Sequence, residues 1–191
     1  MSENIYTDYT RLLAGVLSKK LSPNVYVLGE KLLDSLENDK HVFLCGNGGS
    51  AANANHLAND FISIGFKSGK GIMAEALTAN SAVLTCIAND YGYEDIFSRQ
   101  LEVKATEGDV LIALSGSGNS VNIVSALNKA ASIGMETFSI VGFDGGESKL
   151  IANHPIHFDV HDMQIAEDLQ LVVGHMCMRW MLEHRCDGGY V

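Results

Sequence analysis

Twice along this chain, a short apolar run passes directly into a loop rich in glycine, serine and asparagine, and a helical pattern follows. The first run is His41–Cys45, which leads into Gly46–Ser50, and the second is Asp109–Leu114, which leads into Ser115–Ser120. Short continuous apolar runs are typical of strands buried on both faces, as in a parallel sheet covered by helices. The chain is therefore predicted to be an α/β protein whose glycine-serine loops lie at the carboxyl ends of strands.

The remaining segments continue this alternation. Further strands are predicted at Gly71–Leu77, Val83–Ile87, Thr137–Val141 and Ile156–Val160. Ser22-Pro23 marks one helix start, because Ser is a preferred N-cap and Pro is tolerated at the first helical position. Helices are predicted at Ile5–Lys20, Pro23–Leu36, Ala51–Phe61, part of Asp90–Lys104, from the second loop to Ser132, and at Met163–His184.

Length and composition exclude several classes of protein. The 191 residues suit one domain with a full core. The formal net charge of −10 disfavours nucleic acid as a partner, because binding its backbone requires clustered Lys and Arg. No apolar stretch reaches the roughly 20 residues of a membrane span, and the N-terminus lacks a signal-peptide core, so no membrane partner is expected. Four cysteines without C-x-x-C or metal-like spacing are predicted to be free thiols in a reducing cytoplasm: Cys45, Cys86, Cys177 and Cys186.

The loop Ser115–Ser120 has the composition of an anion-binding site. Its glycines let the backbone approach a ligand, its serines offer hydroxyl donors, and the next helix start offers unpaired N–H groups. A capped tight turn would need only one Ser and one Gly, so the loop favours a phosphate monoester. Gly46–Ser50 is the same kind of element, although a plain glycine turn explains it more readily. Neither loop fits G-x-x-x-x-G-K-[ST] or G-x-G-x-x-G, so no nucleotide cofactor is indicated.

Three segments together resemble a known family. LCGNGGSAANANH, IANDYGYEDIFSRQ and ALSGSGNS are similar to the sugar isomerase (SIS) domain, and most similar to the phosphoheptose isomerases, over about Leu21–Glu183. The resemblance implies a single SIS domain over residues 1–191, with an N-terminal helix at about 3–20 and a core at about 21–185. It also implies a flavodoxin-like, three-layer α/β/α sandwich around a five-stranded parallel sheet.

Helical spacing brings some polar residues onto common faces. His56 and Asp60, four residues apart, share one face of the helix after the first loop. On the last helix Glu167 and His175 lie about 80° apart around the axis. Asp168 aligns better with His175, so spacing alone leaves Glu167 and Asp168 both possible. The resemblance selects Glu167, because phosphoheptose isomerases carry H-x-x-x-E on the first helix and Q-x7-H on the last.

In that family these four residues bind zinc and transfer protons. The resemblance therefore implies that His56, Asp60, Glu167 and His175 hold Zn²⁺ or another divalent transition metal. Asp60 stands where the family has Glu, and Glu167 where it has Gln. As catalytic residues, Asp60 or Glu167 would move the proton between the reacting carbons, and His175 would move the oxygen proton. Which carboxylate is the base stays open.

The resemblance also implies a phosphorylated-sugar site on the two loops. Ser115, Ser117 and Ser120 would hold the phosphate, and Asp90 would bind a sugar hydroxyl. Gly116 replaces a Thr that is usual in the family, so one hydroxyl donor is lost. The expected substrate-binding residues are Asn47, Gly48, Gly49, Ser50, Asn89, Asp90, Ser115, Gly116, Ser117 and Ser120.

The implied activity is the aldose–ketose isomerisation of D-sedoheptulose 7-phosphate to D-glycero-D-manno-heptose 7-phosphate through a metal-assisted enediolate. This would be the first step towards ADP- or GDP-heptose for lipopolysaccharide or capsule. One alternative is an isomerase of another ketose phosphate. Another is a non-catalytic SIS protein that binds the replication initiator, but such relatives lack the metal-binding pair that His56 and His175 would form.

A homotetramer with active sites at subunit interfaces is expected from the same resemblance. The apolar faces of Ile5–Lys20 and Met163–His184 agree with it, because they exceed what one small sheet can cover.

Overall fold

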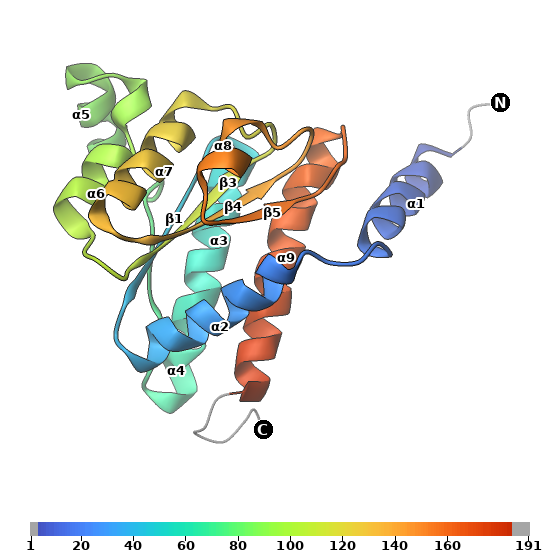
Figure 1. Ribbon diagram of the computed structural model, residues 1–191, viewed down its shortest axis with the longest axis horizontal. Helices are drawn as coiled ribbons and strands as arrows, with labels where there is room; N and C mark the ends of the chain where they lie inside the picture. Colours follow the sequence, from blue (N-terminus) through green and yellow to red (C-terminus); the bar gives the residue numbers. More distant parts are fainter. Residues whose placement is uncertain (1–3, 185–191) are drawn as a thin grey trace.

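A five-stranded, all-parallel sheet forms the centre of the protein (Figure 1). The structure is a computed structural model and describes residues 4–184, without the side chains of residues 67 and 68. The strand order is β2-β1-β3-β4-β5, which is the flavodoxin-like arrangement and confirms the predicted fold class. The strands are β1 (His41–Gly46), β2 (Met73–Ala76), β3 (Val110–Ser115), β4 (Glu136–Val141) and β5 (His154–His157).

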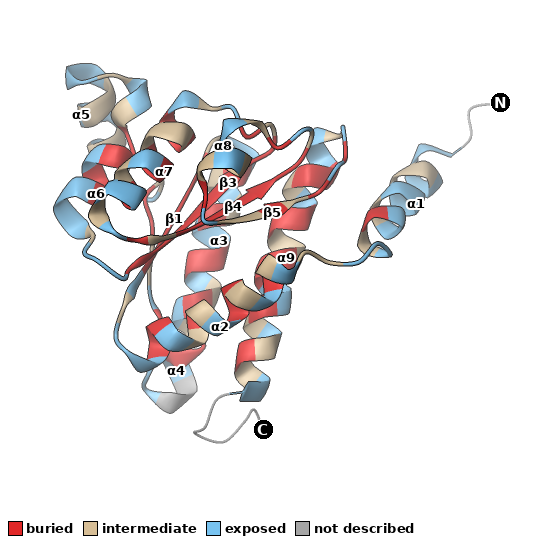
Figure 2. Cartoon of the chain, viewed as in Figure 1, coloured by how far each residue is buried: buried red, intermediate tan, exposed pale blue. Residues whose placement is uncertain are grey.

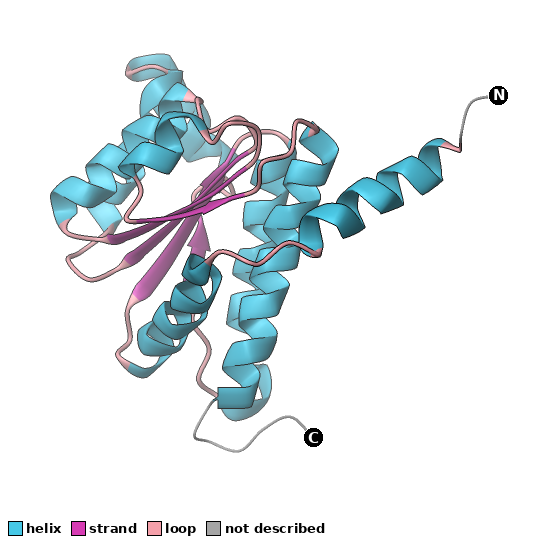
Figure 3. Ribbon diagram, turned by 45° about the vertical axis from the view of Figure 1, so that its right-hand side comes forward, coloured by secondary structure: helices cyan, strands magenta, loops and turns pink. Residues whose placement is uncertain are grey.

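Helices cover both faces of this sheet, which gives the three predicted layers (Figures 1 and 3). Strand residues alternate between the two cores: on β1, Val42 and Leu44 face one side, whereas Phe43 and Cys45 face the other. The first layer holds α2 (Pro23–Glu37), α3 (Gly49–Ser63) and α9 (Met163–His184), and the second holds α6 (Ser98–Lys104), α7 (Val121–Ile133) and α8 (Gly146–Ile151).

The strand register places the two glycine-serine loops next to each other. Gly46 at the end of β1 lies opposite Leu114 on β3, and both strands end at the same edge of the sheet. The chain leaves β1 towards β2 on one side, whereas β3 lies on the other side. This is the switch point at which ligands bind in open α/β sheets.

One predicted strand is wrong and another is displaced. Val83–Ile87 is part of helix α5 (Ser81–Asp90), whose start is capped by the side chain of Asn80, and none of whose residues is buried. The apolar, β-branched composition of this segment misled the strand prediction. The last strand is His154–His157 rather than Ile156–Val160, because an edge strand tolerates Pro155. Two short helices, α4 (Gly65–Ser68) and α8, were not predicted. The 3₁₀ turn η1 (Tyr93–Asp95) and helix α6 lie within Asp90–Lys104, which was predicted to be partly helical.

Helix α1 (Ile5–Leu17) extends away from the sheet and its covering helices (Figures 1 and 2). Val16 is its one buried residue among those described. The hydroxyl of Tyr9 donates a hydrogen bond to Asp168 on α9, and this bond raises the pKa of Tyr9 to about 12. One side of the helix is thus held against the body through Tyr9, Leu13, Val16 and Leu17, whereas Ile5, Tyr6 and Leu12 are exposed.

None of the described helices is both long and apolar enough to cross a membrane.

Candidate active site

Two imidazoles and one carboxylate converge between helices α3 and α9. The Nε2 atoms of His56 and His175 lie 3.1 Å apart. Oδ2 of Asp60 lies 3.3 Å from Nε2 of His56 and 3.2 Å from Nε2 of His175. The predicted proximity of these residues, which are more than a hundred positions apart in sequence, is therefore confirmed. Both imidazoles are about half exposed, so a ligand can reach them from solvent.

Close packing of α3 against α9 makes this convergence possible. Gly174 precedes His175 and is buried against Leu57, which follows His56. A Cβ added at Gly174 would overlap the side chain of Leu57. The missing side chain lets the two helix backbones approach, and so brings the two imidazoles into contact.

The three donor atoms fit a divalent metal ion. His56, Asp60 and His175 form a group whose ligand atoms lie within 4.8 Å of one another. Donors about 2.0–2.1 Å from a tetrahedral Zn²⁺ lie about 3.3 Å from one another. The three observed separations are close to that value, and two imidazoles with one carboxylate are a common donor set for zinc. The site could therefore hold Zn²⁺ with one position left open.

Glu167, the fourth predicted ligand, is not part of this group. Its carboxylate lies against Gly49, the first residue of α3, where a Cβ would overlap it. The amide of Asn53 on α3 donates to the backbone carbonyl of Glu167 at 2.9 Å. The carboxylate thus lies at the positive end of the α3 dipole and beside the first loop.

The second loop presents backbone and hydroxyl groups at the start of α7. Gly118 adopts a φ of 72°, and a Cβ there would overlap the carbonyl oxygen of Gly145. Its N–H donates to Ser115 Oγ at 3.0 Å, which shapes the turn. Ser120 is the N-cap of α7, yet its hydroxyl makes no capping hydrogen bond. That hydroxyl is consequently available to a ligand.

Two other positions of this loop have defined surroundings. The N–H of Asn119 donates to Oγ of Ser117 at 3.3 Å, and Ser117 itself is half-buried. Gly116 is buried, and a Cβ there would overlap the sulfur of Met163 at the start of α9. The methionine therefore occupies the space that a side chain at position 116 would need.

The first loop is fixed by side chains that the sequence patterns did not single out. Gln170 on α9 is fully buried, and its Nε2 donates to Oγ of Ser50 at 3.0 Å. Its Oε1 accepts from Asn53 at 2.9 Å. Gly48 precedes α3 with a φ of 55°, a conformation that favours glycine. A glutamine on the apolar face of α9, in line with Ala166, Val173 and Cys177, was the available signal for this contact.

Asn47, at the tip of the first loop, contacts the start of α7. Its amide pairs with that of Asn122, and its oxygen accepts from the hydroxyl of Tyr93. These residues line a pocket of about 480 Å³ together with Glu94, Ser120 and Val121. The pocket joins the two loops. Tyr93 lies in the segment IANDYGYEDIFSRQ that carries the family resemblance, but neither Tyr93 nor Asn122 was predicted as a site residue.

Asn89 and Asp90 lie at the end of α5, where both are exposed. The amide of Asn89 donates to Asp90 Oδ1 at 2.8 Å, and Cys86 Sγ lies 3.6 Å from Oδ2 of Asp90. Within the described part of the chain, neither side chain forms a hydrogen bond with the two loops.

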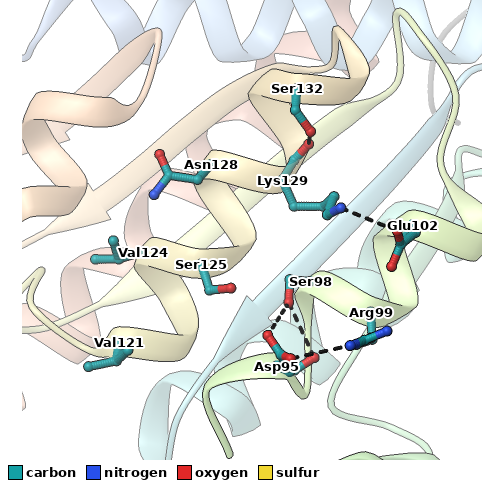
Figure 4. Close-up of a pocket in the computed structure, with 10 residues that line it drawn as sticks. All are labelled: Asp95, Ser98, Arg99, Glu102, Val121, Val124, Ser125, Asn128, Lys129 and Ser132. Carbon is teal, nitrogen blue, oxygen red and sulfur yellow. Dashed lines mark hydrogen bonds and ion pairs between the residues drawn. The ribbon is translucent and has the colours of Figure 1, made fainter. Parts of the chain in front are cut away.

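A second groove, of about 650 Å³, lies between α6 and α7 (Figure 4). Its charged residues are paired with one another: Arg99 lies 3.5 Å from Asp95, and Lys129 lies 3.4 Å from Glu102. The groove therefore offers no uncompensated charge to a ligand.

The described cysteines lie outside the cluster of His56, Asp60 and His175. Burial raises the pKa of both Cys45 and Cys177 to about 12, so these thiols are unreactive. Cys86 is a free thiol on the surface, as predicted, and Cys186 lies outside the described residues.

The chain is similar to known proteins over most of its length. Residues 5–142 match the SIS domain family. The phosphoheptose isomerase of Clostridium acetobutylicum is 44% identical over 147 residues, which cover 77% of this chain and 75% of the relative. That of Burkholderia pseudomallei is 36% identical over 97% of this chain and 94% of its own length. The structure of phosphoheptose isomerase GmhA from Neisseria gonorrhoeae matches with a TM-score of 0.85 and 28% identity, covering 93% of this chain and 94% of that one. The chain therefore belongs to the SIS domain family and, within it, to the phosphoheptose isomerases, which are enzymes.

Proposed function

We propose that this enzyme interconverts D-sedoheptulose 7-phosphate and D-glycero-D-manno-heptose 7-phosphate. The single observation that carries the proposal is the cluster of His56, Asp60 and His175 on α3 and α9, because α3 begins at the first loop at the switch point of the sheet. An aldose–ketose isomerase needs groups that move protons and a separate anchor for the phosphate. The names of the relatives supply the heptose specificity.

A divalent metal ion, Zn²⁺ by the donor set, is proposed as the cofactor, held by His56, Asp60 and His175. When bound, Zn²⁺ supplies Lewis acidity that polarises the carbonyl and hydroxyl oxygens of the sugar. Glu167 was also expected as a ligand, and its carboxylate lies in the same layer but against Gly49. We therefore assign the three clustered residues as ligands and consider Glu167 separately.

The substrate phosphate is proposed to bind the second loop rather than the first. A phosphate at the N-terminus of α3 would lie beside the carboxylate of Glu167, and the two negative charges would repel each other. At the N-terminus of α7, the free hydroxyl of Ser120 and the helix dipole both favour an anion. Ser115 and Ser117 shape this turn through their bonds to backbone N–H groups.

The carbon-bound proton is proposed to be moved by Glu167. Asp60 is already engaged by both imidazoles, whereas the carboxylate of Glu167 forms no hydrogen bond with any other described residue. A general base needs an oxygen lone pair directed at the substrate. His175 would then transfer the proton between the two substrate oxygens.

Conversion of the substrate is the first test. The purified protein, loaded with Zn²⁺, is incubated with sedoheptulose 7-phosphate and the product is followed by NMR, with and without a chelator. We expect an aldose phosphate that forms only slowly after chelation. No product from the metal-loaded sample would contradict the proposal. Faster conversion of fructose 6-phosphate, assayed in parallel, would favour the alternative of another ketose phosphate.

The base is assigned by two isosteric substitutions. We expect Glu167→Gln to lower kcat by about 10²-fold or more, with zinc content unchanged, because only the proton acceptor is lost. Asp60→Asn should lower the zinc content as well. Proton exchange at the reacting carbon, measured in D₂O, separates the two outcomes. If the Glu167→Gln protein still exchanges the carbon-bound proton at the wild-type rate, Asp60 is the base.

The chain is further proposed to act as a homotetramer in the cytoplasm, where it supplies heptose phosphate for lipopolysaccharide or capsule. The exposed apolar residues of α1, such as Ile5 and Leu12, support assembly with other copies.

A further inference from the structure

Three side chains from three separate segments meet in the pocket between the loops. Asn47 lies on the loop after β1, Tyr93 in η1 and Asn122 in the first turn of α7. Asn47 Nδ2 donates to Asn122 Oδ1 at 2.9 Å, and Asn122 Nδ2 donates to Asn47 Oδ1 at 2.8 Å. The hydroxyl of Tyr93 donates to the same Asn47 oxygen at 2.9 Å.

These contacts leave the side-chain amide of Asn47 with a single free hydrogen-bonding group, one N–H. An asparagine amide has one oxygen with two lone pairs and one nitrogen with two hydrogens. Both lone pairs of Asn47 Oδ1 accept internal bonds, and one N–H is donated to Asn122. One N–H remains, so Asn47 can donate to a ligand but cannot accept from it.

The pairing of the two amides alone does not determine which atom of the Asn47 amide is the oxygen and which is the nitrogen. Exchanging oxygen and nitrogen in both Asn47 and Asn122 would preserve the two bonds between them. In the structure the hydroxyl of Tyr93 donates to Asn47 Oδ1, and the Asn47 oxygen is turned towards η1. Asn122 is buried, which holds the pair in place, whereas the ring of Tyr93 is 59% exposed and is not needed to fill a core.

We propose that Tyr93 and Asn122 are positioning residues that fix Asn47 as a single N–H donor to an acceptor oxygen of the bound sugar phosphate. The proposal rests on the proposed function for the identity of that ligand. It follows from the shared pocket, because Ser120 of the phosphate loop lines the same space as Asn47 and Tyr93. The group of the ligand that accepts the hydrogen bond from Asn47 is an oxygen with a free lone pair.

The test is Tyr93→Phe, which removes only the hydroxyl. We expect KM for sedoheptulose 7-phosphate to rise about three- to tenfold, the effect of one weakened hydrogen bond. We expect kcat to stay within about twofold, because a contact made equally in the ground state and the transition state affects KM alone. Tyr91→Phe is the matched control, since Tyr91 is a similarly exposed tyrosine two residues earlier, and should leave both constants unchanged.

A second measurement keeps the proposal testable without turnover. NMR of the asparagine side-chain amides reports the hydrogen bonds of Asn47 and Asn122 directly. Tyr93→Phe should shift the Asn47 amide protons, whereas Tyr91→Phe should not. Unchanged amide signals together with an unchanged KM would overturn the positioning role. Shifted signals in a protein that does not convert sedoheptulose 7-phosphate would support the network while the proposed function fails.

Discussion

The hydroxyl groups of Ser115 and Ser120 on the second loop have different roles, although both residues are serines of the same motif. Ser115 accepts a bond from the N–H of Gly118 and is buried, whereas the N-cap hydroxyl of Ser120 is not used by its own helix. An N-cap serine normally stabilises its helix by about 1 kcal/mol. That contribution is missing at Ser120, which suggests that the hydroxyl serves a ligand.

We therefore expect Ser120→Ala to change the free energy of unfolding by less than about 0.5 kcal/mol, but to raise KM about tenfold by removing a bond to the phosphate. Ser115→Ala should instead cost about 1–3 kcal/mol, because the N–H of Gly118 loses its partner. Denaturant unfolding and steady-state kinetics of both variants give the comparison. If Ser120→Ala markedly lowers the free energy of unfolding and leaves KM unchanged, the Ser120 hydroxyl only caps the helix.

At the scale of elements, the distance between α3 and α9 controls the site. Gly174 packs against Leu57. The residues next to them in sequence, His175 and His56, carry the two imidazoles of the cluster. Gly174→Ala forces a methyl group into this contact, and overpacking of this kind costs about 1–3 kcal/mol. We expect the helices to move apart and the protein to bind zinc more weakly.

The matched control is Gly15→Ala in α1, where a Cβ would meet nothing within 4 Å. Alanine is the better helix former there, so the control should be neutral or slightly stabilising. Zinc titration and thermal unfolding compare the two variants. Unchanged zinc affinity in a stably folded Gly174→Ala protein would show that the contact does not control the cluster.

Strands with a continuous apolar run that is buried on both faces could be predicted from the sequence. Segments that could form either a strand or a helix could not. The apolar runs of β1 and β3 were evident because both faces of these strands are buried. Val83–Ile87 has a similar composition, yet it forms α5, because the choice depends on whether the sheet has a place for another strand. Patterns along one segment do not report that choice.

The candidate site shows the same limit. His56 and Asp60 could be paired from helical spacing, because they lie on one helix. His175 could be joined to them only through family resemblance, since Gly174 sets the approach of α9 in three dimensions. The contact of Asn47 with Tyr93 joins two loops whose separation no sequence pattern encodes.

For the whole molecule, α1 is the feature that a single chain explains least well. It extends from the body (Figure 2). Ile5 is 73% and Leu12 is 42% exposed. A helix with an exposed apolar face is stabilised mainly by packing, so we expect other copies to cover it.

Light scattering should therefore give about four times the chain mass of 20.6 kDa. Leu12→Asp should lower that mass, because a charge enters the apolar face. Leu150→Asp on α8 is the control, since Leu150 is 83% exposed on a different layer and should leave the mass unchanged. A monomeric wild-type protein would contradict the assembly.

The central claim is that groups from α3 and α9 act as one catalytic centre. Its most direct test is the rate at which zinc-loaded His175→Ala converts sedoheptulose 7-phosphate, relative to the wild-type protein at equal concentration. We predict a kcat at least about 10²-fold lower, because both a zinc ligand and a proton carrier are lost. A folded His175→Ala protein that retains the wild-type rate would contradict the account.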